Sequence, residues 1–294
     1  QYGFSSAGCG TDLIFIEAML ARGAEVHVFL PFAKEDFLDT SIRYAGQQWV
    51  ERFERALEKV AHVHHCTSER YLDYDELFNL CNDVAAGFSI MRGHSLNLTP
   101  TLLTVWDGKP GVTGTLAVRW EKEVGNMAHV DSTKLLERLR STKSKPSEEL
   151  PQLVESQPAT LPKAKREIKT LIFADVTNFS SLNDEDNPLF VDTFLAGVAR
   201  LLDKTPTPPT FQNTWGDGLF FVYDDLSDAV QVALNLRDWV DLQEWEKHGL
   251  PAELNIRISL HVGPVYSKDD PVLKRLNYYG THVSRAARIE PITL

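Results

Sequence analysis

The feature that most constrains the fold is a polar stretch in the middle of the chain, from Ser141 to Glu167. Its sequence, STKSKPSEELPQLVESQPATLPKAKRE, is rich in Pro, Ser, Lys and Glu and poor in large apolar residues. Such a composition cannot bury enough apolar surface to fold, so we interpret the stretch as a linker. The 294 residues therefore divide into residues 1–140 and residues 168–294, and each part is long enough to build its own core.

The acidic balance of the chain limits its partners. The formal net charge is −11, whereas nucleic acids and anionic membranes require clustered Lys and Arg. We therefore expect neither as the main partner, and no apolar run reaches the ~18 residues that a membrane-spanning helix needs. The three cysteines, Cys9, Cys66 and Cys81, are too few for a disulfide framework, so we expect reduced thiols and a cytoplasmic location.

Residues 1–140 alternate between helix and strand patterns. Apolar residues at helical spacing, such as Trp49, Phe53, Leu57 and Val60, predict a helix over residues 47–60. Short apolar runs predict strands over residues 25–31, 62–66, 101–108 and 126–131. Strands that alternate with helices form parallel sheets covered by helices, so we predict an α/β fold.

A loop of small residues opens the first predicted helix. It runs from Ser5 to Asp12 and contains Gly8, Gly10 and Thr11. A Gly-rich loop at the start of a helix can hold a phosphate group with its backbone N–H groups. The same residues also suit a tight strand-to-helix turn without a ligand, and the sequence leaves both interpretations open.

Residues 62–66 contain a run of side chains that bind metals in many proteins: His62, His64, His65 and Cys66. On a strand, successive side chains point to opposite faces of the sheet, so these four cannot converge on one ion. We therefore interpret the run as the end of a strand rather than as a metal site.

Residues 168–294 mix the two kinds of element in a different order. A strand is predicted at 169–176, followed by a helix and by two strands around Gly216-Asp217-Gly218, a typical hairpin turn. A long helix over 228–249, a strand over 255–267 and a helix from about Thr281 follow. We therefore predict an α+β domain.

Two aspartates and an arginine carry the chemistry that this domain suggests. Asp175 ends a buried strand and Asp217 occupies the hairpin tip, so the two carboxylates could share a pair of Mg²⁺ or Mn²⁺ ions. On the last helix, Thr281, Ser284 and Arg288 share one face. The guanidinium of Arg288 could bind a phosphate group through two hydrogen bonds.

Four runs of residues, in this order and with these spacings, resemble the class III adenylate/guanylate cyclase catalytic domain. They are FADVTNFSSL, WGDGLFFVYDD, RISLHVGPVY and YGTHVSRAARIE. The resemblance covers residues 168–294 and implies an α+β fold with a ferredoxin-like core. It also implies conversion of a nucleoside triphosphate, with ATP ahead of GTP, into a 3′,5′-cyclic nucleotide and pyrophosphate for intracellular signalling.

The resemblance implies a role for each matching position. Asp175, the carbonyl group of Val176 and Asp217 would bind two Mg²⁺ or Mn²⁺ ions, and Arg288 with Ser284 would act in catalysis. The substrate would be bound by six residues, which are Thr177, Asn178, Phe179, Ser180, Asn213 and Asn277. Family members form head-to-tail homodimers, which implies two equivalent sites shared between two copies of this chain.

Several positions depart from the family pattern. In adenylate cyclases of this family, a lysine and an aspartate recognise adenine, whereas this chain has Asn213 and Asn277 at these positions. Ser284 occupies a position where the family has an asparagine. An amide both donates and accepts hydrogen bonds, so the two asparagines could recognise adenine, guanine or a pyrimidine. The family domain continues beyond this point with a phosphate-binding lysine, so we expect a truncation at Leu294. A degenerate domain that only binds nucleotide or dimerises is the alternative.

Residues 1–140 carry a second resemblance, in the run SSAGCGTDLIFIEAMLARGAEVHVFLP. This run is similar to the Rossmann-like superfamily of nucleoside deoxyribosyltransferases and LOG/DprA-type proteins. The resemblance implies a Rossmann-like domain that senses a nucleotide-derived ligand through the loop of Gly8, Gly10 and Thr11.

Overall fold

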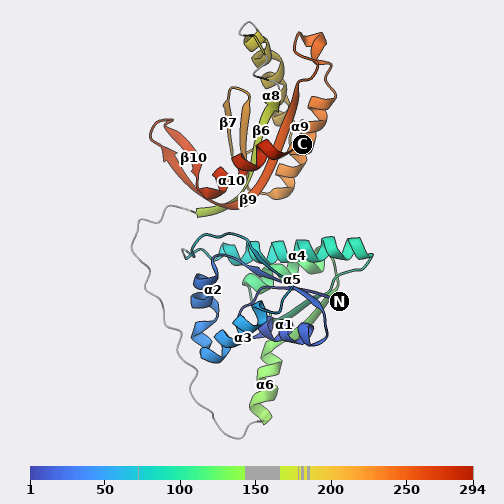
Figure 1. Cartoon of the computed structure of the whole chain (residues 1–294), viewed down its shortest axis with the longest axis vertical. Coiled ribbons are helices and arrows are strands. Elements are labelled where there is room, and N and C mark those ends of the chain that lie inside the picture. The colour runs from blue at the N-terminus through green and yellow to red at the C-terminus, as the bar shows by residue number, and fades with distance from the viewer. Residues whose placement is uncertain (72, 143–165, 178, 180–181, 184–185, 294) are drawn as a thin grey trace. The chain divides into compact units, whose positions relative to one another are not determined.

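The computed structural model describes residues 1–71, 73–142, 166–177, 179, 182–183 and 186–293. The chain divides into two compact units, Gln1–Ala159 and Thr160–Leu294 (Figure 1). The boundary falls inside the stretch predicted to be a linker, most of which lies outside the described residues. Each unit is considered by itself below.

Parallel strands alternate with helices along the N-terminal unit, as the sequence pattern predicts. Strands β1, β2 and β3 form one parallel sheet in that order, and β4 and β5 form a parallel pair. The elements are β1 (Tyr2–Ser5), α1 (Thr11–Ala21), β2 (Glu25–Leu30), α2 (Lys34–Ser41), α3 (Gln47–Leu57), β3 (His62–His65), α4 (Glu76–Leu96), β4 (Leu102–Trp106), α5 (Val112–Glu123), β5 (Met127–Asp131) and α6 (Ser132–Thr142).

The N-terminal unit also contains elements that the pattern did not predict, namely β1, α2 and α6. Helix α6 ends at Thr142, two residues beyond the predicted domain boundary. Its start is stabilised by Asp131, whose Oδ1 accepts the backbone N–H groups of Thr133 and Lys134 at 2.9 and 3.1 Å. A carboxylate in this position satisfies N–H groups that have no partner within the helix, which favours helix formation after β5.

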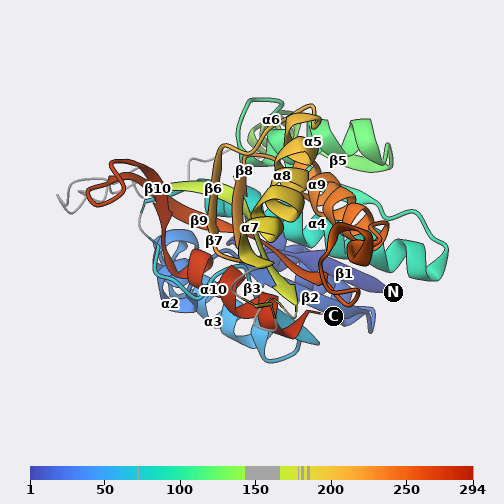
Figure 2. The same ribbon diagram turned by 90° about the horizontal axis from the view of Figure 1, so that it is seen from above.

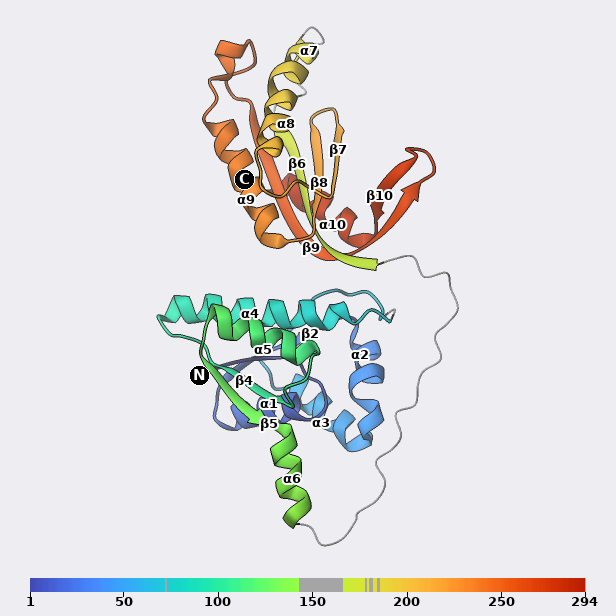
Figure 3. The same ribbon diagram turned by 180° about the vertical axis from the view of Figure 1, so that it is seen from behind.

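Helices cover both faces of the N-terminal strands. Figure 3 shows α4 and α5 on one side of the strands, with α1 and α3 on the other. Phe29 of β2 packs on Phe88 of α4, with ring centroids 5.2 Å apart. Because side chains alternate along a strand, Glu25 and His27 belong to the same face of β2 as Phe29.

The C-terminal unit contains a five-stranded antiparallel sheet in the order β10-β9-β6-β8-β7. Its elements are β6 (Arg166–Thr177), α7 (Asn187–Phe190), a π-helical turn (Val191–Leu195), α8 (Ala196–Asp203), β7 (Phe211–Trp215), β8 (Gly218–Tyr223), α9 (Leu226–Asp241), β9 (Asn255–Asp270), β10 (Arg275–Tyr279) and α10 (Thr281–Ile289). The βαββαβ order with β6 between β8 and β9 is that of a ferredoxin-like core. The predicted α+β fold is confirmed.

Three boundaries in the C-terminal unit differ from the prediction. Strand β6 begins at Arg166 rather than at Lys169. Helix α9 ends at Asp241, and Trp245–His248 form a separate 3₁₀ turn because the indole of Trp245 is buried in the core. Strand β10 was not predicted, and it pairs with the end of β9.

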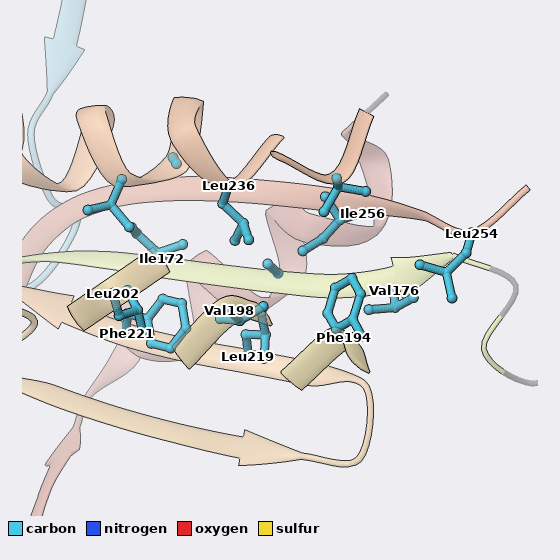
Figure 4. Close-up of a cluster of buried hydrophobic side chains, with 14 of the residues drawn as sticks. Ile172, Val176, Phe194, Val198, Leu202, Leu219, Phe221, Leu236, Leu254 and Ile256 are labelled. Atoms are coloured by element: carbon cyan, nitrogen blue, oxygen red, sulfur yellow. The ribbon is translucent and has the colours of Figure 1, made fainter. Parts of the chain in front are cut away.

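The main core of the C-terminal unit lies between the sheet and helices α7, α8 and α9. Figure 4 shows it as a layer of apolar side chains from β6, β8, β9 and the helices. Labelled members of this layer are Ile172, Val176, Phe194, Val198, Leu202, Leu219, Phe221, Leu236, Leu254 and Ile256. Helix α10 packs on the opposite face of the sheet, where Ala286 joins a smaller cluster (Figure 2).

The closest helix packing in this core depends on Gly197 of α8. A Cβ atom at this position would lie 2.2 Å from Cζ2 of Trp239 on α9, so the indole would have to move. We expect Gly197→Ala to lower the free energy of unfolding of the C-terminal unit by about 1–3 kcal/mol. Urea unfolding of the full chain, followed by tryptophan fluorescence, measures this difference.

A second helical glycine provides the control for this prediction. Gly87 of α4 has open space where a Cβ atom would be added. Gly87→Ala should therefore stabilise the chain by up to about 1 kcal/mol, because alanine favours the helix. The packing argument is contradicted if Gly197→Ala is as stable as the parent protein.

Candidate active site

Two aspartates that are distant in the sequence meet at one end of the C-terminal sheet. Asp175 lies two residues before the end of β6, and Asp217 lies in the turn that joins β7 to β8. Ala174 pairs with Leu219 across β6 and β8, which places the turn beside Asp175. Burial raises the pKa of Asp217, and the charge of Asp175 and a hydrogen bond with it raise it further. The two carboxylates therefore interact directly.

An arginine and a glutamate complete this cluster. Arg257 lies opposite Asp175 in the pairing of β9 with β6. Its Nη2 donates to Oδ2 of Asp175 at 2.7 Å, and its Nε donates to Oε1 of Glu290 at 2.8 Å. The sequence analysis missed both residues as site members, although Arg257 begins the quoted run RISLHVGPVY.

The cluster contains more negative than positive charge. Burial raises the pKa of Glu290, the charges of Asp175 and Asp217 add to this, and Arg257 opposes it. A raised carboxyl pKa means that the charged form lacks sufficient compensation in its surroundings. The end of β6 would therefore gain stability from additional positive charge.

Asp175 and Asp217 are suited to bind the divalent ions that were predicted from the sequence. Carboxylate oxygens are the ligands that Mg²⁺ and Mn²⁺ prefer, and Asp175 and Asp217 place two carboxylates side by side. Among the residues that the structure describes, no group of three or more His, Cys, Asp or Glu side chains is arranged to hold a metal ion as it stands. The protein thus offers two carboxylates to such ions, and a bound phosphate would have to supply further oxygen ligands.

The predicted catalytic residues of α10 are exposed to solvent. Ser284 and Arg288 both lie on the exposed surface of the helix. Within the described part of the chain, the guanidinium group of Arg288 takes part in no hydrogen bond or ion pair. Arg288 is therefore available to a ligand or to a second copy of the chain.

A pair of histidines, the half-buried His261 and the buried His282, holds α10 against the sheet and was not predicted. Nε2 of His261 on β9 and Nδ1 of His282 on α10 are 2.8 Å apart. Burial lowers the pKa of His282 to about 4, and the charges of His261, Arg285 and Arg166 contribute. The pair is therefore neutral at physiological pH. Gly263 leaves room for it, since a Cβ atom there would lie 2.1 Å from His282.

The two asparagines expected to read the base lie on the outer strands of the sheet. Oδ1 of Asn213 on β7 accepts a hydrogen bond from Nη2 of Arg275 on β10 at 2.7 Å. Nδ2 of Asn277 donates to Oδ2 of Asp270 at 3.1 Å, and the hydroxyl group of Tyr279 donates to the same oxygen at 2.6 Å. Both amides are thus held by charged neighbours that the sequence analysis did not consider.

Part of the expected phosphate-binding turn can be located. Val176 is buried and Thr177 is half-buried at the end of β6. The ring of Phe179 packs edge-on against Phe190 at 4.8 Å, so this side chain belongs to the core and only its backbone could meet a ligand. Asn178 and Ser180 lie outside the described residues.

The N-terminal loop is organised around a half-buried aspartate, Asp12. Asp12 accepts hydrogen bonds from the hydroxyl group of Ser6 and from the N–H group of Gly8, and burial raises its pKa. Gly10 has a φ of 99° and immediately precedes Thr11, the first residue of α1. Because Gly8 already donates to Asp12, it is not free to bind a phosphate. Ligand binding at Gly8, Gly10 and Thr11 stays a prediction.

No helix in the described part of the chain is long and apolar enough to cross a membrane.

Solved structures that are similar to this chain are cyclase domains. The adenylyl cyclase CyaB from P. aeruginosa is 20% identical, and the similarity covers 44% of this chain and 74% of that chain with a TM-score of 0.39. The guanylyl cyclase domain of the RhoGC fusion protein from the aquatic fungus Blastocladiella emersonii is 21% identical, covering 45% of this chain and 80% of that chain with a TM-score of 0.38. No curated protein matches the chain.

The sequence itself matches a family model over most of the C-terminal unit. The match covers residues 161–293, and the family is described as the adenylate and guanylate cyclase catalytic domain. This range includes Asp175, Asp217 and Arg288 together with the sheet that positions them. Residues 161–293 are thus similar to the adenylate and guanylate cyclase catalytic domain.

Proposed function

We propose that the C-terminal unit converts a nucleoside triphosphate into a 3′,5′-cyclic nucleotide and pyrophosphate. The observation that carries this proposal is the position of Asp217 in the turn beside Asp175, where two carboxylates at one end of the sheet call for a cation. A domain that only bound nucleotide or dimerised would have no need for two adjacent carboxylates with poorly compensated charge.

The reaction is an intramolecular displacement at the α-phosphorus. The 3′-oxygen of the substrate gives its proton to solvent water and bonds to the α-phosphorus, while the bond from that phosphorus to the bridging oxygen breaks and pyrophosphate leaves. Bound Mg²⁺ or Mn²⁺ would lower the pKa of the 3′-hydroxyl group and neutralise charge on the phosphates. Asp175 and Asp217 would hold these ions, and the backbone carbonyl group of Val176 would add an oxygen ligand.

Apart from holding the ions, the protein would position the substrate and stabilise the negative charge that develops on the phosphate. Arg288 carries a permanent charge that can meet developing negative charge on the phosphate through two hydrogen bonds. The hydroxyl group of Ser284, one turn earlier on α10, can donate one further hydrogen bond. The His261–His282 pair and the bond from Ser259 Oγ to the carbonyl group of Ala286, at 2.9 Å, hold this helix in place.

We propose that two copies of the chain share each site. Within the described residues, no hydrogen bond or ion pair joins Arg288 to Asp175 or Asp217. A head-to-tail homodimer would bring Arg288, Asn213 and Asn277 of one copy to the aspartates of the other. Two-fold symmetry then creates two equivalent sites.

Arg275 supports GTP as a second candidate substrate beside ATP. Its guanidinium group occupies the acceptor oxygen of Asn213, which leaves N–H donors of both residues for a ligand. Guanine presents two acceptors, O6 and N7, on one edge, and arginine is the side chain that most often recognises this edge. Adenine carries an amino group, which is a hydrogen-bond donor, at the position of O6. It therefore fits the N–H donors of Asn213 and Arg275 less well than guanine does.

The first prediction concerns activity and the base. The full chain, incubated separately with ATP, GTP, CTP and UTP in Mg²⁺ or Mn²⁺, should form one main cyclic product. Arg288→Ala should lower kcat by about 10²–10³-fold, the usual cost of removing one preorganised electrostatic group. Chromatography of the products measures both, and the exposed Arg237→Ala on α9 serves as the control. Absence of any cyclic product would instead favour the nucleotide-binding or dimerisation alternative.

The second prediction tests the shared sites. Asp217→Ala and Arg288→Ala should each be inactive, because each dimer then lacks the same group in both sites. An equal mixture should regain about a quarter of the parent activity, since half of the dimers are mixed and each has one complete site. Mass photometry of tagged copies verifies that the subunits have exchanged. If activity is not regained after this exchange, each copy acts alone.

The third prediction concerns Asp217 as a metal ligand. Its raised pKa means that the folded protein holds this proton more tightly than the unfolded chain does. The stability from this proton is present below the ordinary Asp pKa and is lost as the pH rises through the raised value. Metal-free Asp217→Asn should therefore be more stable than the parent at neutral pH.

Addition of Mn²⁺ should reverse this order. The parent protein should gain thermal stability because the ion binds the folded state, and Asp217→Asn should not. Thermal unfolding in EDTA and in Mn²⁺ measures both effects, with the exposed Asp241→Asn at the end of α9 as the control. An equal response of parent and Asp217→Asn to Mn²⁺ would exclude Asp217 as a ligand.

A further inference from the structure

A cluster of histidines on the N-terminal unit plays no part in the proposed function. His27 of β2 pairs with His62 of β3, and Phe29 pairs with His64. All three imidazole rings lie close together, with centroids 4.8 Å apart for His27 and His62, 5.4 Å for His27 and His64, and 5.9 Å for His62 and His64. The pairing of β2 with β3 thus places His27 close to His62 and His64, a proximity that the sequence of β3 alone does not show.

Two nitrogen atoms of this cluster have a separation typical of metal ligands. Nδ1 of His27 and Nε2 of His64 are 3.1 Å apart. Two imidazole nitrogens on one tetrahedral Zn²⁺ ion, each about 2.0–2.1 Å from the metal, lie about 3.3–3.4 Å apart. In the metal-free protein this contact is a hydrogen bond in which one ring donates to the other, so an ion would replace the shared proton and both rings would turn until their lone pairs converge.

Glu25 fixes the orientation of the His27 ring. Its Oε1 lies 3.0 Å from Nε2 of His27, within hydrogen-bond distance. An ionised carboxylate can only accept hydrogen bonds, so the imidazole proton lies on Nε2 and the lone pair of Nδ1 faces His64. A carboxylate bonded to the outer nitrogen is the usual support of a metal-binding histidine.

Two aromatic side chains hold His64 in one orientation. Phe29 stacks on one side at 4.6 Å, and Phe88 of α4 lies at 5.1 Å. These aromatic contacts restrict the ring before any ion binds.

His62 is the third ring and the one that must move. It is exposed, so its side chain can turn toward the other two without repacking a core. Imidazole rings bound to one tetrahedral ion have centroids about 5 Å apart, a value close to the three separations observed here. In the described residues no three ligands already surround one point, so the turn of His62 is a necessary step.

We propose that His27, His62 and His64 bind one transition-metal ion of the Zn²⁺ class, with Glu25 supporting His27. Imidazole ligands favour Zn²⁺, Co²⁺, Ni²⁺ and Cu²⁺ over Mg²⁺. The fourth position would be open to water or to a ligand. The site lies wholly within the N-terminal unit and is independent of the cyclase activity.

Co²⁺ binding to the full chain provides the test, because tetrahedral Co²⁺ absorbs visible light. The metal-free protein is titrated with Co²⁺ in excess Mg²⁺, which occupies oxygen sites, and then with Zn²⁺. We expect one equivalent of Co²⁺ to bind with a tetrahedral spectrum and Zn²⁺ to displace it. The absence of a Co²⁺ spectrum together with no Zn²⁺ binding in calorimetry would overturn the proposal.

Variants assign the signal to the cluster. His27→Gln, His62→Gln and His64→Gln should each weaken binding by at least tenfold, and Glu25→Gln should weaken it about tenfold or more. His65→Gln is the matched control, because His65 is the next residue on β3 and points to the opposite face. Binding that persists in His27→Gln and His64→Gln, with folding verified by circular dichroism, would place the ion elsewhere and refute the proposal.

Discussion

The pairing of β6 with both β8 and β9 is the constraint on which the C-terminal unit depends. It places Asp175 beside the turn that carries Asp217 and opposite Arg257. Asp217 and Arg257 are both distant from Asp175 in the sequence, so only the register of the sheet brings the three charged side chains together. A shift of one residue would turn Asp175 toward the other face and would expose the apolar side chains of β6. The same hydrophobic packing that stabilises the core therefore also fixes the geometry of the site.

This geometry has an energetic cost that points to function. Burial and mutual repulsion raise the pKa values of Asp217 and Glu290, and Arg257 compensates only part of the charge. A structure selected for stability alone would separate these carboxylates or add a second cation. Strain of this kind is concentrated at functional sites and is supported by well-packed surroundings, which the aromatic and aliphatic layer below β6 supplies.

The sequence predicted the parts of this domain that depend on local pattern. Asp175 at a strand end, the Gly216–Gly218 turn and the start of α10 at Thr281 all follow from short-range rules and lie where predicted. Arg257, Arg275 and the His261–His282 pair were missed because they act through partners on other strands. Cross-strand pairing is decided by register, which a pattern along one strand does not contain.

The same limitation explains the histidines of the N-terminal unit. Alternation along residues 62–66 excludes convergence of all four potential ligands, but it leaves His62 and His64 on one face. Only the parallel register with β2 places His27 between them and Glu25 behind it. The two proposed sites then differ in chemistry as well as in location, since Asp175 and Asp217 offer oxygen and the histidines offer nitrogen. Mg²⁺ and Zn²⁺ would therefore be sorted between the two units by ligand type, without competition for one site.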